Sequence, residues 1–382
     1  MNEIVLQNLE AGMKRQIQAL PPILRPFTAH ERDLPRAVVL TGQRGTGKTT
    51  FLLHHAKERH FLYFSADNPV LAGDSLYEIV HFIFMQGFEG VIVDEVHFAR
   101  DWSLHLKALY DDFPGRFLWA SDSSSLVLRA GTGDLSRRFV PLIMPLLSFR
   151  EFVALKTGKT YAVFKPFESI PVVADAELLS LFREYKIHGT RPFFSEGNFP
   201  ERMLGILEKT LHSDIPFFLP QITDGNIRLM NAIVGTLAKA SIPRLQVRSL
   251  CADWNIGAEK LYQLLFVMES VGVVRIIRKE NDTKANTVGD KLFFGDPALY
   301  GVLDGDLGSA REAMVAAMLG EAGLRVESTR DETIGDFIVQ GTISIEIGGA
   351  SKKIKKSDFV IRDDIDLPAG RALPLWSLGF MY

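Results

Sequence analysis

The sequence predicts an α/β fold with a parallel β-sheet in its N-terminal part, and three observations predict it. Short apolar runs alternate with stretches of helical apolar spacing between residues 36 and 120. A glycine-rich segment separates the first apolar run from the first of these helices. Polar clusters at 42–49, 94–95 and 121–125 directly follow apolar runs. Because parallel sheets bind ligands beyond the carboxyl ends of their strands, we expect these clusters to share one ligand site.

Composition limits the classes of protein to consider. The chain has 382 residues, 47% hydrophobic and 23% charged, which is typical of a folded protein of two or three domains. A formal net charge of -3 excludes a polycation, so nucleic-acid binding would need a local basic surface. The single cysteine, Cys251, excludes an intrachain disulfide and fits a reducing compartment. We find neither a secretory signal nor an apolar run of about 18 residues, and we expect a cytoplasmic protein outside the membrane.

The N-terminal elements follow from apolar spacing and from helix breakers. Residues 3–20 have helical spacing and stop at Pro21 and Pro22. Strands are expected at residues 36–40, 61–64, 90–93 and 117–120. Helices between them are expected at residues 50–59, 76–85 and 102–110. Beyond Pro145 the pattern becomes helical through about residue 220.

The pattern Gly42-x-x-x-x-Gly47-Lys48-Thr49 is a complete P-loop between a predicted strand and a predicted helix. Such a loop closes backbone N–H groups around phosphate oxygens at a helix N-terminus. Lys48 would reach the β- and γ-phosphates, and the Thr49 hydroxyl would ligate Mg²⁺. The alternative is a glycine-rich turn that binds nothing. The residues expected to bind ATP are Gly42, Gln43, Arg44, Gly45, Thr46, Gly47, Lys48, Thr49 and Thr50.

Two acids end the third predicted strand. Asp94 is expected to hold Mg²⁺, and Glu95 to activate the attacking water as a general base. The alternative is a pair of exposed acids on a turn. With Lys48 in the P-loop, these acids predict hydrolysis of ATP as well as binding.

Three further residues are candidates for catalysis. Ser121, at the end of the next strand, would sense the γ-phosphate; otherwise 121–125 is a serine-rich turn that caps a helix at Leu126. Arg137 or Arg138 would project into a neighbouring subunit as an arginine finger. The alternative for both arginines is a solvated pair, or a pair bound to a local carboxylate.

At this point the chain resembles the prokaryotic AAA-type ATPases that carry a C-terminal domain of unknown function. The matching residues are 40–50, 93–97, 102, 106–111, 123–125, 135–138, 145–152, 345–349 and 374–380. The resemblance implies an AAA+-like ATPase module, a helical lid, a winged helix and a terminal α/β domain similar to restriction-endonuclease folds. The expected domains are 1–150, 151–222, 223–282 and 283–382. It also implies a homo-oligomer, such as a hexameric ring, whose active sites are shared between subunits.

The sequence departs from this pattern at two places. Asp122 stands where the family has a small residue after the first sensor. Residues 188–192 resemble the lid motif only loosely, so Arg191 is expected to be an ordinary surface arginine, with a second sensor as the alternative.

Residues 244–278 fit a helix-turn-helix followed by a β-wing. The first helix begins at Leu245, Asn255 to Gly257 form the turn, and the second helix covers 258–271. In the DNA-binding interpretation this helix enters the major groove and presents Glu259, Lys260, Tyr262 and Gln263. Basic side chains of the wing, Arg275, Arg278 and Lys279, then hold phosphates. The alternative is a winged helix used for protein packing.

Residues 283–382 contain acids that a metal-dependent nuclease would need, namely Glu312, Asp336 and Glu346. The lysine expected two residues after the last acid is replaced by Gly348, which argues against cleavage. Later lysines would form a phosphate-binding patch or a solvated loop: Lys352, Lys353, Lys355 and Lys356.

The sequence therefore predicts an oligomeric, Mg²⁺-dependent ATPase that acts on DNA. A second hypothesis is a signalling or defence switch in which the nucleotide controls assembly with a protein partner. A third is an ATP-regulated nuclease.

Overall fold

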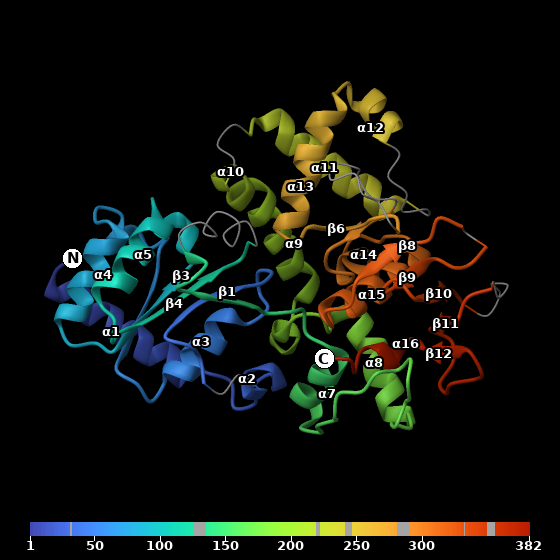
Figure 1. The fold of residues 1–382 in the computed structure, drawn as a ribbon, viewed down its shortest axis with the longest axis horizontal. Coiled ribbons are helices and arrows are strands. Elements are labelled where there is room, and N and C mark those ends of the chain that lie inside the picture. Colours follow the sequence, from blue (N-terminus) through green and yellow to red (C-terminus); the bar gives the residue numbers. More distant parts are fainter. Residues whose placement is uncertain are drawn as a thin grey trace. The chain divides into compact units, whose positions relative to one another are not determined.

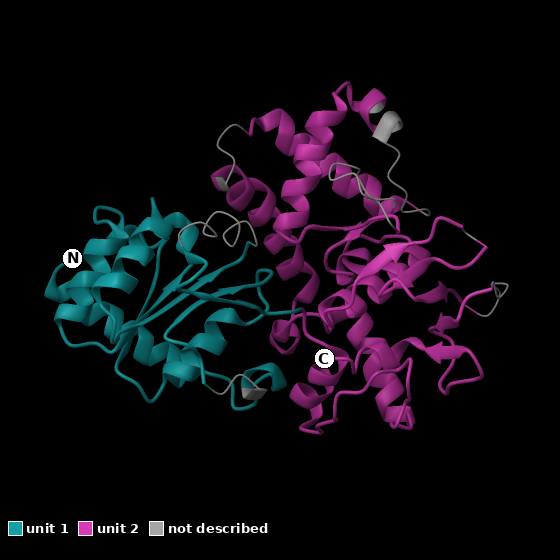
Figure 2. Ribbon diagram, in the orientation of Figure 1, with its two compact units in different colours: residues 1–145 teal, residues 146–382 magenta. Residues whose placement is uncertain are grey.

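The computed structural model describes residues 1–30, 33–124, 135–218, 222–240, 247–280, 291–331, 333–349 and 356–382. They form two compact units, Met1–Pro145 and Leu146–Tyr382 (Figure 2). Several predicted features lie outside the described residues: Ser125, the helix at Leu126, the start at Leu245 of the first helix of the helix-turn-helix, and Lys352, Lys353 and Lys355. In the part of the chain that is described, no helix has the length and apolarity needed to cross a membrane.

Unit 1 contains a parallel sheet whose described strands lie in the order β2-β3-β4-β1-β5. The strands are β1 Ala37–Thr41, β2 Phe61–Ser65, β3 Gly90–Asp94, β4 Phe117–Asp122 and β5 Val140–Ile143. The first four confirm the predicted strands, and with them the α/β class. Strand β5 was not predicted, since Pro141 interrupts a short run; as an edge strand it tolerates the missing N–H donor.

Helices cover both faces of this sheet, with α1 and α3 on one side and α4 and α5 on the other (Figure 1). The helices of unit 1 are α1 Glu3–Gln18, α2 Pro26–His30, α3 Lys48–Ala56, η1 Pro69–Leu71, α4 Leu76–Met85, η2 Val96–Phe98 and α5 Trp102–Asp112. Helix α4 begins where it was predicted because Ser75 and Glu78 form a capping box. Val38, Leu40 and Ile92 of the sheet pack with Phe51 and Leu52 of α3 in one buried cluster.

The strand register brings the carboxyl ends of the central strands to one edge. Thr41 of β1 pairs with Asp122 of β4, and Val93 of β3 pairs with Ala120 of β4. The loop after β1 and the polar residues that end β3 and β4 consequently lie at the same edge, as the sequence predicted.

Unit 2 combines helices with a hairpin and a mixed sheet of the described order β12-β11-β10-β9-β8. Its strands are β6 Val274–Ile277, β7 Lys291–Phe294, β8 Val326–Ser328, β9 Phe337–Val339, β10 Ile343–Ile347, β11 Phe359–Arg362 and β12 Ala372–Pro374. Its helices are α7 Phe149–Thr157, α8 Ala176–His188, η3 Pro192–Glu196, α9 Phe199–Lys209, η4 Thr210–Asp214, α10 Ile215–Phe218, α11 Asp224–Lys239, α12 Val247–Trp254, α13 Ala258–Ser270, α14 Ala298–Val302, α15 Leu307–Glu321 and α16 Leu375–Leu378.

The segment predicted to be a winged helix contains α12, α13 and the antiparallel pair β6–β7. Strand β7 follows residue 282, where the sequence placed a domain boundary, so that boundary separates two strands that pair. The winged helix and the four-domain division remain predictions.

The expectation of a surface position for Arg191 is wrong. Its side chain is only 2% exposed, and its Nε lies 2.8 Å from Oδ2 of Asp296. Thr190 donates a hydrogen bond to the same carboxylate oxygen. The partner acid lies 105 residues further along the chain, so local sequence reasoning had no means of finding it.

Candidate functional site

The P-loop joins β1 to α3 and needs glycine at two positions for different reasons. Gly47, the residue before α3, has φ 100°, a left-handed conformation that favours glycine. A Cβ on Gly42 would lie 2.5 Å from the carbonyl oxygen of Met144, which is too close for any side chain. The loop therefore has the compact path that the P-loop pattern predicts.

Lys48 is the first residue of α3, and its ammonium folds back over the loop. Its Nζ donates hydrogen bonds to the carbonyl oxygens of Gly42 at 2.8 Å and Gln43 at 3.2 Å. Burial lowers the pKa of Lys48, although the nearby acids Glu95 and Asp94 oppose this shift. A nucleotide phosphate would give this buried cation a stronger acceptor than two carbonyls.

Asp94, the last residue of β3, accepts hydrogen bonds from three side-chain hydroxyls. Thr49 donates to Oδ2 at 2.7 Å and Tyr63 to the same oxygen at 3.0 Å. Ser121 donates to Oδ1 at 2.5 Å. The side chains of Thr49 and Asp94 thus meet, and both offer the oxygen ligands that Mg²⁺ prefers. The donor set fits this ion.

Glu95 follows Asp94 in a left-handed conformation, with φ 48° and ψ 48°. Its Oε1 lies 3.1 Å from a guanidinium nitrogen of Arg44 in the P-loop. Its Oε2 accepts a hydrogen bond from the Ser123 hydroxyl at 3.2 Å. Burial raises the pKa of Glu95, and the charge of Arg44 opposes this shift. Glu95 is therefore not the exposed acid of the alternative interpretation.

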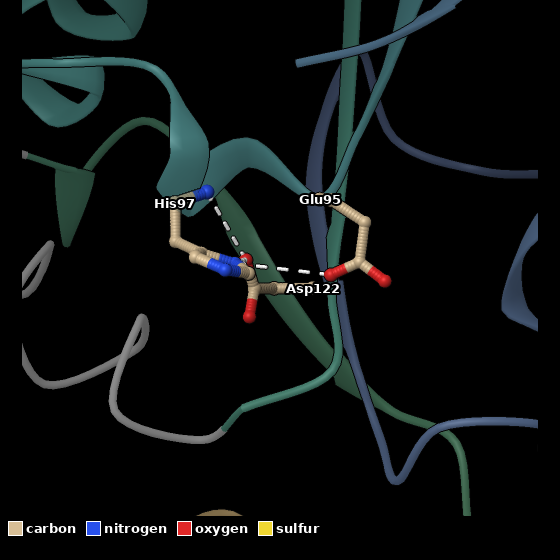
Figure 3. Close-up of side chains that lie close together, drawn as sticks. All are labelled: Glu95, His97 and Asp122. Atoms are coloured by element: carbon tan, nitrogen blue, oxygen red, sulfur yellow. Dashed lines mark hydrogen bonds and ion pairs between the residues drawn. The ribbon is translucent and has the colours of Figure 1, made fainter. Parts of the chain in front are cut away.

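His97 and Asp122 lie beside Glu95, and sequence reasoning assigned neither to the site. Figure 3 shows the three side chains together, where η2 follows β3 and where β4 ends. The His97 ring nitrogen Nδ1 lies 2.6 Å from Oδ2 of Asp122 and 3.8 Å from Oε2 of Glu95. These three side chains offer ligand atoms within 4.8 Å of one another, which is also compatible with a metal ion. The spacing Asp94-Glu95-Val96-His97 was the available signal, but it does not reveal a partner in β4.

Ser121 is fully buried, with its hydroxyl committed to Asp94. Its predicted role as a γ-phosphate sensor remains a prediction. The pairing explains why a serine lies near the end of β4: it helps to orient the acid at the end of the neighbouring strand.

The two candidate arginine fingers differ in their surroundings. Arg138 makes two hydrogen bonds of 2.8 Å to the carboxylate of Asp111, which is the local pairing that the alternative interpretation anticipated. Arg137 is exposed and pairs with no acid among the residues that the structure describes. This contrast makes Arg137 the better candidate for a finger.

Two residues that sequence reasoning missed support the site. The buried Arg25 donates hydrogen bonds to the carbonyl oxygens of Thr46 and Pro145, which fastens the P-loop to the end of unit 1. Tyr63 reaches Asp94 from β2. No motif marks either residue, because each acts through a hydrogen bond whose partner is distant in sequence.

Two of the three acids that suggested a nuclease, Glu312 and Asp336, lie beside a lysine that the sequence did not single out. Nζ of Lys291, in β7, donates to Glu312 of α15 at 2.7 Å and lies 3.8 Å from Asp336. The other oxygen of Asp336 accepts a hydrogen bond from the backbone N–H of Ile347. Glu346 is buried in β10. An ammonium thus lies beside Glu312 and Asp336 although Gly348 replaces the expected lysine.

Two of the three basic residues of the predicted wing are paired within unit 2. Arg275 lies 2.5 Å from Glu321, and Arg278 lies 2.9 Å from Glu269. These pairings reduce the positive charge that the wing would offer to DNA phosphates.

Comparison with known proteins supports a class for the part of the chain that contains the P-loop. Residues 34–153 match the model of a protein family described as "AAA domain", a stretch that contains the P-loop, Asp94 and Glu95. The uncharacterized protein MJ1637 of Methanocaldococcus jannaschii is 29% identical over 270 residues, which cover 63% of this chain and 56% of that protein. The match thus spans about half the length of this curated relative.

Similar solved structures include the Walker-type ATPase paby2304 of Pyrococcus abyssi, with a TM-score of 0.45 and 14% identity over 73% of this chain and 94% of that chain. A variant of RuvB from Thermotoga maritima has a TM-score of 0.35 and 16% identity over 72% of this chain and 89% of that chain. The family match and the parallel sheet with its P-loop support an AAA-type ATPase domain. At this level the resemblance found in the sequence is confirmed; the winged helix and the nuclease-like domain stay predictions.

Proposed function

We propose that unit 1 binds ATP with Mg²⁺ and hydrolyses it to ADP and phosphate. The observation that carries this proposal is the meeting of Lys48, Thr49, Asp94 and Glu95 at one edge of the sheet. A glycine-rich turn without a ligand would not need a buried ammonium, and exposed acids would not accept this many hydrogen bonds.

Each residue has a distinct task in this reaction. Lys48 neutralises the β- and γ-phosphates, and the N–H groups of the P-loop bind their oxygens. Thr49 and Asp94 would hold Mg²⁺, which draws electron density from the phosphate oxygens when it is bound. Glu95 accepts a proton from the attacking water, and the oxygen of that water forms the new bond to the γ-phosphorus as ADP leaves.

Paired variants test the proposal. Glu95→Gln should bind a fluorescent ATP analogue normally but hydrolyse ATP roughly 100- to 10,000-fold more slowly, since it cannot accept the proton. Lys48→Ala should lose binding and hydrolysis together. Normal ATPase activity in Lys48→Ala would contradict the proposal.

For the partner of the ATPase, the pairings of Arg275 and Arg278 favour a nucleotide-controlled switch that binds a protein over one that binds DNA. Both hypotheses include the oligomer with shared active sites. Stimulation of the ATPase by DNA, with a steep decrease as salt is raised, would restore the DNA-binding hypothesis. An ATP-dependent change in oligomer size without DNA stimulation supports the protein-binding switch. An ATP-regulated nuclease is the weaker alternative, because Gly348 stands at the position where a nuclease would need a lysine.

A further inference from the structure

Asp122 is a fully buried carboxylate at the end of β4, in a position where a small residue was expected. Burial of a charge is costly unless the group is paired and hydrogen-bonded. Its Oδ2 accepts the backbone N–H of His97 at 3.1 Å and faces the ring Nδ1 at 2.6 Å. Its Oδ1 accepts the backbone N–H of Ser124 at 2.9 Å. Asp122 therefore fastens both the backbone and the side chain of His97 to the end of β4.

His97 lies in η2, the turn that begins immediately after Glu95. A left-handed conformation at a residue other than glycine persists only where the surrounding structure imposes it. His97 makes two hydrogen bonds to Asp122, which hold the turn two residues after Glu95. They therefore help to impose the backbone conformation of Glu95. Glu95 then directs its carboxylate between Arg44 and Ser123.

The two segments also meet at the carboxylate of Glu95 itself. Its Oε2 accepts the hydroxyl of Ser123, the residue after Asp122, and lies 3.8 Å from Nδ1 of His97. The position of this one oxygen thus depends on the end of β4 and on the turn. Any shift between the two would move it.

A hydrogen bond explains the His97–Asp122 contact better than a metal ion does. A ring N–H of histidine can donate a hydrogen bond to a carboxylate oxygen, and the contact has the geometry of such a bond. At 2.6 Å the nitrogen and oxygen atoms lie at the distance of a short hydrogen bond.

We propose that His97 and Asp122 are positioning residues that set Glu95 in place for proton abstraction. The proposal rests on the proposed ATP hydrolysis. Neither residue touches the nucleotide in this scheme; both act through Glu95.

The test compares His97→Ala in two backgrounds by single-turnover hydrolysis of radiolabelled ATP, with Kd for a fluorescent ATP analogue measured alongside. In the wild-type background His97→Ala should lower the rate roughly 100-fold at nearly unchanged Kd, because a base displaced by about 1 Å loses that much. In the Glu95→Gln background the same substitution should cause no further loss. His97→Asn retains an N–H donor and should restore part of the rate. His81→Ala, in α4, is the matched control and should change neither quantity.

Three results would overturn the proposal. The first is a loss of rate in His97→Ala that multiplies with the loss caused by Glu95→Gln. The others are a weaker nucleotide affinity of His97→Ala, and stoichiometric Zn²⁺ binding that His97→Asn removes. Each is distinguishable from failure of the proposed function, in which the wild-type protein shows no ATP hydrolysis that Lys48→Ala abolishes. The rate of the double variant Asp122→Asn with His97→Ala, measured in the same way, should be no lower than the rate of the slower single variant.

Discussion

At the scale of single residues, the site depends on the hydrogen bonds that orient Asp94. Oδ2 of this carboxylate accepts hydrogen bonds from the hydroxyls of both Thr49 and Tyr63. Thr49 is also expected to ligate Mg²⁺, whereas Tyr63 has no other role in the site. Burial, together with the charge of Asp94 and the hydrogen bond to it, raises the pKa of Tyr63, so its hydroxyl stays a donor through the neutral range.

Tyr63→Phe should weaken the magnesium site without removing a catalytic group. Loss of this donor leaves Asp94 less firmly oriented, so we expect the Mg²⁺ concentration for half-maximal ATPase activity to rise several-fold. The maximal rate at saturating Mg²⁺ should change little. Tyr77→Phe is the matched control, because Tyr77 also donates to an aspartate, Asp112, but on an exposed surface of unit 1. An unchanged Mg²⁺ requirement in Tyr63→Phe would show that Thr49 and Ser121 suffice to orient Asp94.

The sequence predicted the residues whose spacing has a chemical meaning: Lys48, Thr49, Asp94 and Glu95. It did not predict Tyr63, because a tyrosine in an apolar run is typical of a sheet core. Its role follows from the pairing of β2 with β3, where Ser65 lies opposite Asp94. Asp122 was noticed as unusual, but its partner His97 depends on a turn geometry that local sequence patterns do not specify.

At the scale of elements, Arg25 connects the segment before α2 to the P-loop. Arg25→Met should leave the carbonyl oxygens of Thr46 and Pro145 without this donor and lower the free energy of unfolding by roughly 2 kcal/mol. Because the loop is then less ordered before the nucleotide binds, affinity for ATP should fall as well. Denaturant unfolding and nucleotide titration measure the two effects.

Arg36→Met provides a matched control for this prediction. Arg36 also donates to backbone carbonyls, those of Tyr110 and Phe113, but at the start of β1, away from the P-loop. The Arg36→Met variant should therefore be less stable than the wild type but bind the nucleotide with the same affinity. An equal loss of affinity in both variants would mean that Arg25 contributes only general stability.

In unit 2 an ion pair between Lys291 and Glu312 connects β7 to α15. Lys291→Met leaves the carboxylates of Glu312 and Asp336 without their ammonium, and we expect a loss of about 3 kcal/mol in the free energy of unfolding. The double variant Lys291→Met with Glu312→Gln should recover part of this loss, since one uncompensated charge is gone. Denaturant unfolding of all three variants tests the coupling; strictly additive losses would contradict it.

At the scale of the whole molecule, the sequence predicted the α/β class and the order of the elements in unit 1 but not the cohesion of unit 2. In unit 1, short apolar runs alternate regularly with stretches of helical spacing, and this local pattern predicts a parallel sheet. In unit 2, Arg191 and Asp296 pair across 105 residues of sequence, between segments that were assigned to different domains. Contacts of this range depend on tertiary packing, which local patterns do not encode.

The proposed oligomer leads to a prediction about Arg137. If this arginine completes the site of a neighbouring subunit, Arg137→Ala should lower the ATPase rate by at least about 100-fold while each P-loop still binds nucleotide. Mixing Arg137→Ala with Lys48→Ala should then restore activity. Some sites combine an intact P-loop from one subunit with Arg137 from the other, so random mixing in equal amounts predicts about a quarter of the wild-type rate.

Arg138→Ala is the control within the same segment. Because Arg138 is held by Asp111 of its own chain, its removal should leave most of the rate, and mixing with Lys48→Ala should bring no recovery above the average of the two proteins. Fluorescence energy transfer between labelled subunits would establish that mixed oligomers form. Mixed oligomers that stay inactive would place Arg137 outside the neighbouring site, and the ATPase would then have to stabilise its transition state with residues of a single chain.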